Sequence, residues 1–115
     1  MFALNFYTDL YAEMLRTNRK TATIRLGDKK HKYTSGQLVW ITVGQRFGRR
    51  KKLFTAMIDR VDVKPLLELS PRDIERENPE FRSIEDVTHL MNLIYDLEVS
   101  PEDVCTVIYF SRIDE

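Results

Sequence analysis

The chain has 115 residues, of which 43% are apolar and 31% charged, and this fits one globular domain over residues 1–115. No run is apolar enough to span a bilayer and no secretory leader is visible, so we expect a cytoplasmic protein without a membrane partner. The net charge is zero, but residues 1–60 carry 13 Lys or Arg against 4 Asp or Glu, and residues 61–115 carry 5 against 14.

Two strands and a helix are predicted in the first third of the chain. The apolar run Phe2–Phe6 indicates a strand, and the spacing over Leu10–Arg16 indicates a helix. Asn18 tolerates the left-handed conformation that often ends a helix, and the alternating segment Lys20–Arg25 predicts the second strand. A polar loop is expected over Leu26–Gln37.

The middle of the chain is predicted to form a β-hairpin. Leu38–Val43 is largely apolar on both faces, which is typical of a central strand. The glycine-containing segment Gly44–Lys52 suits the connection to a long alternating strand, Leu53–Val63, which ends before Pro65.

Two helices and a core strand are predicted in the last third. Ser70 and Pro71 start the first helix, with a serine N-cap and a proline at the first helical position. Ser83 starts the second helix in capping-box form. Helical spacing predicts that its buried side holds Ile84, Val87, Met91 and Ile94. Val104–Phe110 is apolar on both faces, as in a core strand. These segments together predict an antiparallel, barrel-like sheet flanked by short helices.

The segment Asn18–Arg25 concentrates the residues that can carry chemistry. Its alternation predicts that Thr21, Thr23 and Arg25 share one face of a strand, with Lys20 just before them. The same pattern is also typical of an edge strand with a solvated face. Both interpretations stay open from these residues alone.

A lysine can act as a base, and a threonine as a nucleophile, when neighbouring groups shift their pKa. Positive charges at Arg19 and Arg25 would lower the pKa of Lys20, whereas a nearby carboxylate such as that of Glu77 would raise it. These two effects on the pKa oppose each other, and the sequence does not show which of them is larger.

The remaining residues predict no metal site and no cofactor. Cys105 lies in an apolar strand, and His31 and His89 share no metal-ligand spacing. A glycine-rich phosphate-binding loop is absent from the sequence. The basic run Arg49–Lys52 is typical of a solvated turn, although it can also contact a nucleic-acid backbone.

The order of these motifs resembles the activating-signal-cointegrator homology (ASCH) domain, a PUA-like barrel. The signature Gly-x-Lys-x-x-x-x-Arg of that family is matched by Asn18-Arg19-Lys20-Thr21-Ala22-Thr23-Ile24-Arg25. Asn18 replaces the usual glycine, but asparagine also tolerates the left-handed conformation, so the turn can survive. The resemblance implies an α+β fold, a PUA-like antiparallel β-barrel of about five strands flanked by about three short helices.

Two strings are similar to the small single-domain branch of this family that hydrolyses N4-acetylcytidine: Arg19-Lys20-Thr21-Ala22-Thr23-Ile24-Arg25 and Glu75-Arg76-Glu77-Asn78. The resemblance implies an amidohydrolase that gives cytidine and acetate, with Lys20, Thr23 and Glu77 as the catalytic group. Substrate contacts are expected from Thr21, Arg25 and Asn78. Either Lys20 is the base for Thr23, or Glu77 is the base and Lys20 supplies a fixed positive charge.

Two alternatives do not involve catalysis. PUA-like barrels commonly bind RNA, and the basic half suits a polyanionic partner unless the oppositely charged halves pair with each other. The predicted nucleic-acid contacts are Arg19, Lys30, Lys32, Arg49, Arg50, Lys51 and Lys52. The second alternative is a nucleotide-like ligand bound without turnover. The oligomeric state does not follow from the sequence.

Overall fold

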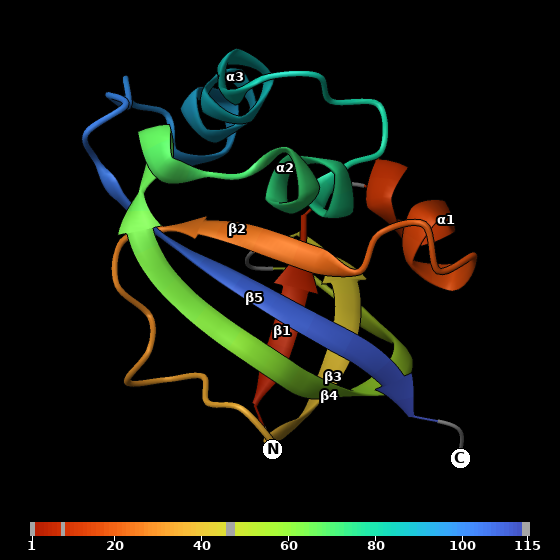
Figure 1. Ribbon diagram of the computed structural model, residues 1–115. Helices are drawn as coiled ribbons and strands as arrows, with labels where there is room; N and C mark the ends of the chain where they lie inside the picture. Colours follow the sequence, from red (N-terminus) through yellow and green to blue (C-terminus); the bar gives the residue numbers. More distant parts are fainter. Residues whose placement is uncertain (1, 8, 46–47, 114–115) are drawn as a thin grey trace.

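The computed structural model describes residues 2–7, 9–45 and 48–113. Within these ranges, one sheet of five strands is accompanied by three α-helices and a short 3-10 turn (Figure 1). The strands are β1 (Ala3–Phe6), β2 (Ala22–Leu26), β3 (Leu38–Gly44), β4 (Arg50–Pro65) and β5 (Val104–Ile113). The helices are α1 (Leu10–Arg16), α2 (Pro71–Glu77) and α3 (Ile84–Tyr95), with the turn η1 (Leu66–Glu68). No helix in the described part is long and apolar enough to cross a membrane.

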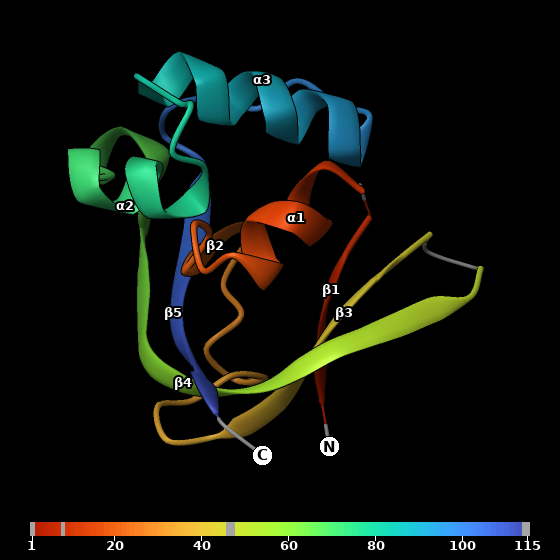
Figure 2. The ribbon, with the colours of Figure 1, turned by 90° about the vertical axis from the view of Figure 1, so that its right-hand side faces the viewer.

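The sheet is mixed, with the strand order β1-β3-β4-β5-β2. Neighbouring strands run antiparallel except β1 and β3, which are parallel, so the expectation of a wholly antiparallel sheet was wrong at this pair. The reason is the connection: between β1 and β3 the chain passes through α1 and β2 and re-enters the sheet in its original direction. The sheet curls into a half-barrel whose edges are β1 and β2 (Figure 2).

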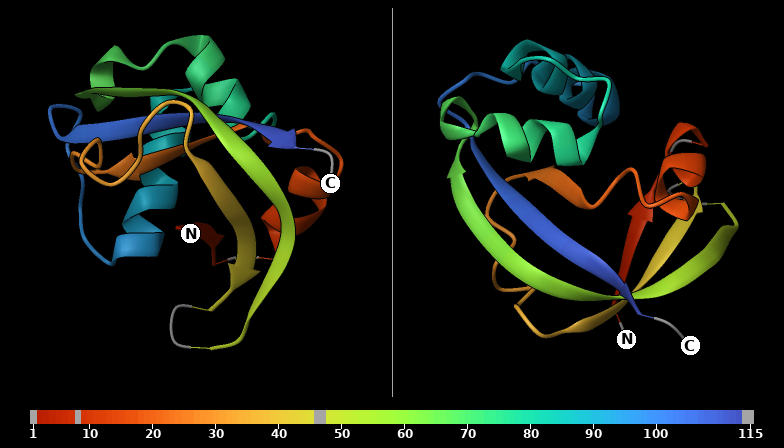
Figure 3. Two further views of the ribbon diagram at one scale, coloured as in Figure 1. Left: turned by 90° about the horizontal axis from the view of Figure 1, so that it is seen from below. Right: turned by 45° about the vertical axis from the view of Figure 1, so that its right-hand side comes forward.

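Two irregularities help the sheet to curl. The register shifts between Ile41 and Thr42 on β3, and again between Ile58 and Arg60 on β4. Such bulges increase the local twist and bend of a strand. β4 spans 16 residues and sweeps through a wide arc, pairing with β3 along one part and with β5 along another (Figure 3).

β5 separates two apolar clusters. Ile108 and Phe110 face the cluster that contains α1 and β3, whereas Cys105, Val107 and Tyr109 face the cluster beneath α2 and α3. Because successive strand residues point to opposite faces, a strand buried on both sides must be apolar at nearly every position. The prediction of a core strand here is confirmed.

Most predicted boundaries agree with the structure. α1 has the expected bounds, Asn18 adopts the left-handed conformation at φ +60°, and α2 and α3 both begin with capping boxes. β3 lies between β1 and β4, as expected of a central strand. β4 starts at Arg50, earlier than predicted, because the basic residues pair with the end of β3. The predicted burial of Ile94 was wrong: 41% of this residue is exposed, because its turn of α3 faces an open pocket.

Candidate functional site

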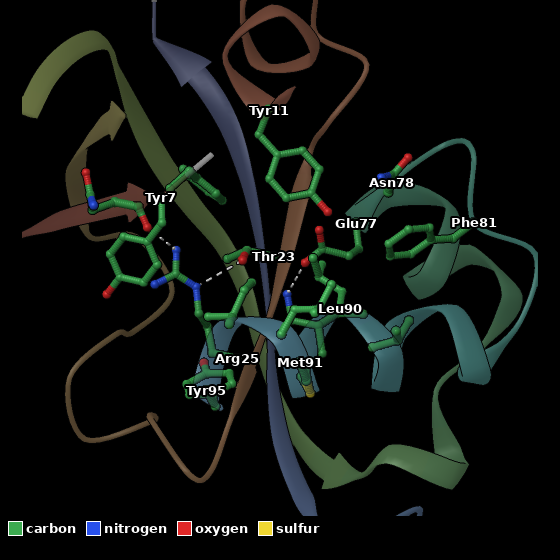
Figure 4. Close-up of a pocket in the computed structure, with 16 residues that line it drawn as sticks. Tyr7, Tyr11, Thr23, Arg25, Glu77, Asn78, Phe81, Leu90, Met91 and Tyr95 are labelled. Carbon is green, nitrogen blue, oxygen red and sulfur yellow. Dashed lines mark hydrogen bonds between the residues drawn. The ribbon is translucent and has the colours of Figure 1, made fainter. Parts of the chain in front are cut away.

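A pocket of about 380 Å³ opens where the half-barrel is not closed, and we call it the seam pocket. The edge strand β1 contributes Asn5 and Phe6, and the edge strand β2 contributes Thr23, Ile24 and Arg25. Helix α1 adds Tyr11, and the end of α2 adds Glu77 and Asn78 (Figure 4). The α3 side of the pocket is formed by Val87, Leu90, Met91, Leu93, Ile94 and Tyr95. One wall is therefore polar and the opposite wall is largely apolar.

Arg25 bridges the gap between the two edge strands. Its Nη2 donates to the backbone oxygen of Asn5 at 3.1 Å, and its Nε donates to Thr23 Oγ1 at 3.0 Å. The guanidinium carbon also lies 5.1 Å from the centre of the Phe6 ring. These contacts hold Thr23 in place and occupy one of its hydroxyl lone pairs, while the hydroxyl hydrogen can still be donated.

Glu77 presents its carboxylate to the seam pocket, and Lys20 lies behind it. Lys20 Nζ donates to Glu77 Oε2 at 2.5 Å, to the backbone oxygen of Glu77 at 2.7 Å and to that of Ala22 at 2.8 Å. These three acceptors match the three N–H groups of an ammonium. The side chain of Lys20 is fully buried and does not line the pocket. Glu77 Oε1 accepts the backbone N–H of Ile24 at 2.9 Å, which fixes the carboxylate against β2.

Burial is the main influence on the charge of Lys20. Burial lowers the pKa of the ammonium, the Glu77 carboxylate raises it, and Arg25 lowers it by a smaller amount, so that the pKa falls from 10.5 to about 8. The sequence indicated only the two opposing charge effects, because a sequence pattern does not show that a lysine between Arg19 and Arg25 is buried. At pH 7 the group remains an ammonium paired with a carboxylate.

Five of the predicted site residues gather at or directly behind the seam pocket: Lys20, Thr23, Arg25, Glu77 and Asn78. Thr21 does not line it. Thr21 lies with Asn18 and Arg19 in a separate surface depression, where its hydroxyl accepts the Nε–H of Arg76 at 2.7 Å. β2 starts only at Ala22, so the strand alternation used to place Thr21 beside Thr23 does not reach it.

Sequence reasoning missed Tyr11 and the α3 wall. Tyr11 is 4% exposed, and Lys20 Nζ lies 4.3 Å from the centre of its ring. Its hydroxyl is buried and has no hydrogen-bond partner among the described residues. An aromatic residue on a short amphipathic helix is typical of a core position, so the sequence carried no signal for a role at a pocket.

The predicted nucleic-acid contacts do not form one patch. Lys30 and Lys32 precede β3, whereas the run Arg49–Lys52 follows it at the β3–β4 hairpin, so the two groups lie at opposite ends of one strand (Figure 2). Arg19 lies elsewhere, in the depression beside α2. At the hairpin, Lys52 Nζ lies 5.2 Å from the centre of the ring of Trp40, which is 43% exposed.

Among the described residues, no group of three or more His, Cys, Asp or Glu side chains is placed to hold a metal ion. His31 and His89 are both exposed. Cys105 is fully buried, and burial raises the pKa of its thiol to about 11, so it is a packed side chain and not a reactive thiolate.

Neither a protein-family model nor a curated protein sequence matches the chain. Solved structures do match it. Protein EF3133 of Enterococcus faecalis, described with the family model DUF984, has a TM-score of 0.72 at 18% identity, over 99% of this chain and 81% of that one. The hypothetical protein PH0355 has a TM-score of 0.68 at 19% identity, over 97% and 98% of the two chains.

An ASCH domain from Lactobacillus crispatus has a TM-score of 0.68 at 13% identity, over 94% of this chain and 77% of that one. Sequence identities below 20% carry information about the fold alone. The curled five-stranded sheet, its helices and these neighbours agree, and the chain has an ASCH-like, PUA-like α+β fold.

Proposed function

We propose that the protein is an amidohydrolase that removes the acetyl group from N4-acetylcytidine or from a related N-acylated pyrimidine nucleoside. One observation carries the proposal: the Thr23 hydroxyl and the Glu77 carboxylate line the same pocket, and a buried lysine ammonium binds that carboxylate from behind. The resemblance of the Lys20, Thr23 and Glu77 motifs to those of N4-acetylcytidine amidohydrolases supports the same reaction.

The seam pocket suits an acylated pyrimidine in size and in character. Its volume of about 380 Å³ lies within the range of roughly 300–1,000 Å³ that is usual for small-molecule sites. The polar wall offers Asn78, Glu77 and Thr23 to the edge of a base, and the apolar wall of α3 can cover its flat face. The combination of a few convergent polar groups with an apolar surround is typical of sites that orient a small ligand.

The contacts of Lys20 favour Glu77 as the general base. An amine must be neutral to accept a proton, but Lys20 donates to three acceptors and is an ammonium at neutral pH. It also lies outside the pocket lining. Glu77 forms an ion pair with this cation and lines the pocket. Lys20 therefore acts as a fixed positive charge that holds the carboxylate in place.

The reaction has two stages. In the first, Thr23 Oγ1 attacks the acetyl carbon while Glu77 takes the hydroxyl proton, and Arg25 Nε stabilises the oxygen as it loses that proton. The C–N bond then breaks as Glu77 returns the proton to N4, which releases cytidine and leaves an acetyl ester on Thr23. In the second stage, Glu77 takes a proton from a water whose oxygen attacks the acyl carbon of the ester. The bond from that carbon to Thr23 Oγ1 then breaks as Glu77 returns the proton to Oγ1, which releases acetate and restores Thr23.

Chromatography of N4-acetylcytidine incubated with purified protein tests the proposal, because cytidine and acetate must appear in equal amounts. Thr23→Ala should lower kcat by about 100-fold or more, while Thr23→Ser, which keeps a hydroxyl, should retain much of the activity. Thr55→Ala is the matched control, since Thr55 is a buried strand threonine that does not line the seam pocket. Absence of turnover by the wild type contradicts the proposal, and full turnover by Thr23→Ala removes Thr23 from the nucleophile role.

RNA binding without catalysis is the second candidate function, and the exposed Trp40 favours it. Trp40 and the neighbouring Lys52 combine an aromatic surface with a cation at the base of a hairpin that carries further basic residues. Single-stranded nucleic acids bind to such surfaces by stacking a base on the ring and by placing phosphates against the cations.

A further inference from the structure

Tyr11 carries a buried polar group that the reaction described above does not use. The residue is only 4% exposed, it lines the seam pocket, and its hydroxyl has no hydrogen-bond partner among the described residues. Tyr33 is buried to the same extent in the same apolar cluster, but its hydroxyl donates to the backbone oxygen of Ala3 at 3.2 Å. A buried hydroxyl without a partner costs free energy, and such groups are expected where a ligand supplies the missing partner.

The surroundings of Tyr11 hold its ring in one place. The Phe6 ring packs edge-to-face against it at a centre-to-centre distance of 6.2 Å, and Lys20 Nζ lies 4.3 Å from the ring centre. Figure 4 shows the hydroxyl pointing toward Glu77, the residue that serves as the base in the proposed reaction. Burial raises the pKa of the phenol most, and the charge and nearness of the Glu77 carboxylate raise it further, while Asn78 acts in the opposite direction. The hydroxyl therefore keeps its proton, and although Glu77 and Asn78 lie near it, neither meets it with hydrogen-bond geometry.

We propose that Tyr11 is a further catalytic residue, whose hydroxyl donates a hydrogen bond to the acyl carbonyl oxygen of the bound substrate. This inference rests on the proposed amide hydrolysis. When Thr23 Oγ1 bonds to the acyl carbon, the π electron pair of the carbonyl moves onto its oxygen, and the hydroxyl of Tyr11 stabilises the oxyanion. When the C–N bond breaks, the pair re-forms the carbonyl, and Tyr11 keeps its proton throughout.

Tyr11 is better placed for this role than Arg25. Two N–H groups of the Arg25 guanidinium already donate, one to Thr23 and one to the backbone of Asn5, and these contacts tie it to the edge strands. The hydroxyl of Tyr11 keeps its proton and forms no hydrogen bond of regular geometry with the described residues, although the Glu77 carboxylate lies nearby. Donors that are already oriented where negative charge develops contribute strongly, because nothing has to reorganise during the reaction.

Tyr11→Phe tests the inference by removing only the hydroxyl. We expect kcat for N4-acetylcytidine to fall by about 100-fold or more, with KM changed only a few-fold, because the hydrogen bond strengthens as the oxyanion forms. The Tm of the free protein should stay the same or rise, since an unsatisfied buried group has been removed. Tyr33→Phe is the matched control: it removes a hydroxyl that has a partner, so its Tm should fall while kcat stays near that of the wild type.

Other outcomes overturn the inference. A fall in kcat of less than threefold shows that the hydroxyl does not contact the reacting carbonyl. A loss of Tm in Tyr11→Phe equal to that of Tyr33→Phe shows a structural role instead. N4-methylcytidine, which has no acyl carbonyl, distinguishes a carbonyl contact from a change of pocket shape. Its inhibition constant should be the same for wild type and Tyr11→Phe. If Tyr11→Phe weakens inhibition by N4-methylcytidine as much as it lowers turnover of N4-acetylcytidine, the proposal is contradicted.

A failure of the proposed hydrolysis itself can be distinguished from a failure of the inference about Tyr11. If the wild type does not hydrolyse N4-acetylcytidine, calorimetric binding of N4-acetylcytidine and N4-methylcytidine to both proteins decides about Tyr11. A loss of about fivefold or more confined to the acetylated ligand supports the carbonyl contact without turnover. Equal binding of that ligand by wild type and Tyr11→Phe, or binding of neither nucleoside, overturns it.

Discussion

At the scale of single residues, Lys20 determines how the site responds to pH. Its pKa of about 8 means that the ammonium beside Glu77 becomes an amine as the pH rises above that value. If the positive charge is required, kcat/KM should be level near pH 7 and should fall about tenfold per pH unit well above 8. If neutral Lys20 were the base, kcat/KM would instead rise with pH and level off above 8.

The sign of the slope therefore chooses between the two assignments that the sequence leaves open. The measurement is kcat/KM for N4-acetylcytidine between pH 6 and 9.5, with circular dichroism at each pH to exclude unfolding. Cys105→Ala is a useful control, because burial raises the pKa of that thiol to about 11 and its removal should leave the profile between pH 6 and 9.5 unchanged. A profile that rises through pH 8 contradicts the role of Lys20 as a fixed charge.

The residues of the seam pocket were only partly accessible from the sequence. The motif around Lys20 and Thr23 predicted the polar wall because the chemistry of those side chains and their strand spacing are local properties. The pairing of Lys20 with Glu77 joins positions 57 residues apart, so the residues allowed it as one possibility and the resemblance implied it, but no local pattern required it. Tyr11 gave no signal, because a pattern shows that a residue is apolar and periodic but not that its hydroxyl lacks a partner.

At the scale of elements, α3 supplies the apolar wall of the seam pocket, and its exposed end offers a direct test. Leu93 lines the pocket although it is 70% exposed, whereas Leu97, just beyond the helix, is 48% exposed and does not line it. Leu93→Ser should raise KM about 3- to 10-fold, through the loss of about 1 kcal/mol of apolar contact with substrate, and should leave kcat nearly unchanged.

The paired variant Leu97→Ser controls for a general loss of apolar surface. Both substitutions are at exposed positions, so each should change the free energy of unfolding in urea by less than about 0.5 kcal/mol. An equal rise in KM for both variants, or no rise for Leu93→Ser, contradicts a role of the α3 wall in binding.

Local signals predicted the elements well and their spatial arrangement less well. Capping residues at Ser70 and Ser83 placed the starts of α2 and α3, since a cap acts within a few residues. The parallel pairing of β1 with β3 depends on the route of the chain through α1 and β2, which no local pattern records. The exposure of Ile94 likewise depends on α3 lying over the unclosed edge of the sheet.

At the scale of the whole molecule, the two oppositely charged halves of the sequence meet in the Lys20–Glu77 pair, but other ion pairs form within one half. Lys30 pairs with Asp28 within the basic half, and Lys64 pairs with Asp73 within the acidic half, whereas Arg60 and Asp62 lie on either side of the boundary and only two residues apart. The ion pairs of the folded chain therefore do not all join the basic half of the sequence to the acidic half. The basic residues Arg49–Lys52 of the hairpin are exposed.

Salt dependence separates a polyanion-binding role from nucleoside hydrolysis. If about four phosphates of a single-stranded RNA contact this hairpin, the affinity should fall about 50-fold between 50 and 200 mM salt, measured by fluorescence anisotropy. The double variant Arg49→Ala with Lys51→Ala should weaken binding and flatten this slope, whereas Arg16→Ala, at an exposed position on α1, should change neither. Hydrolysis of the uncharged N4-acetylcytidine should vary less than twofold over the same range, because no phosphate counterions are released. RNA affinity that is insensitive to salt, or a slope that the double variant does not alter, contradicts an RNA-binding role for this hairpin and leaves the seam pocket as the site of function.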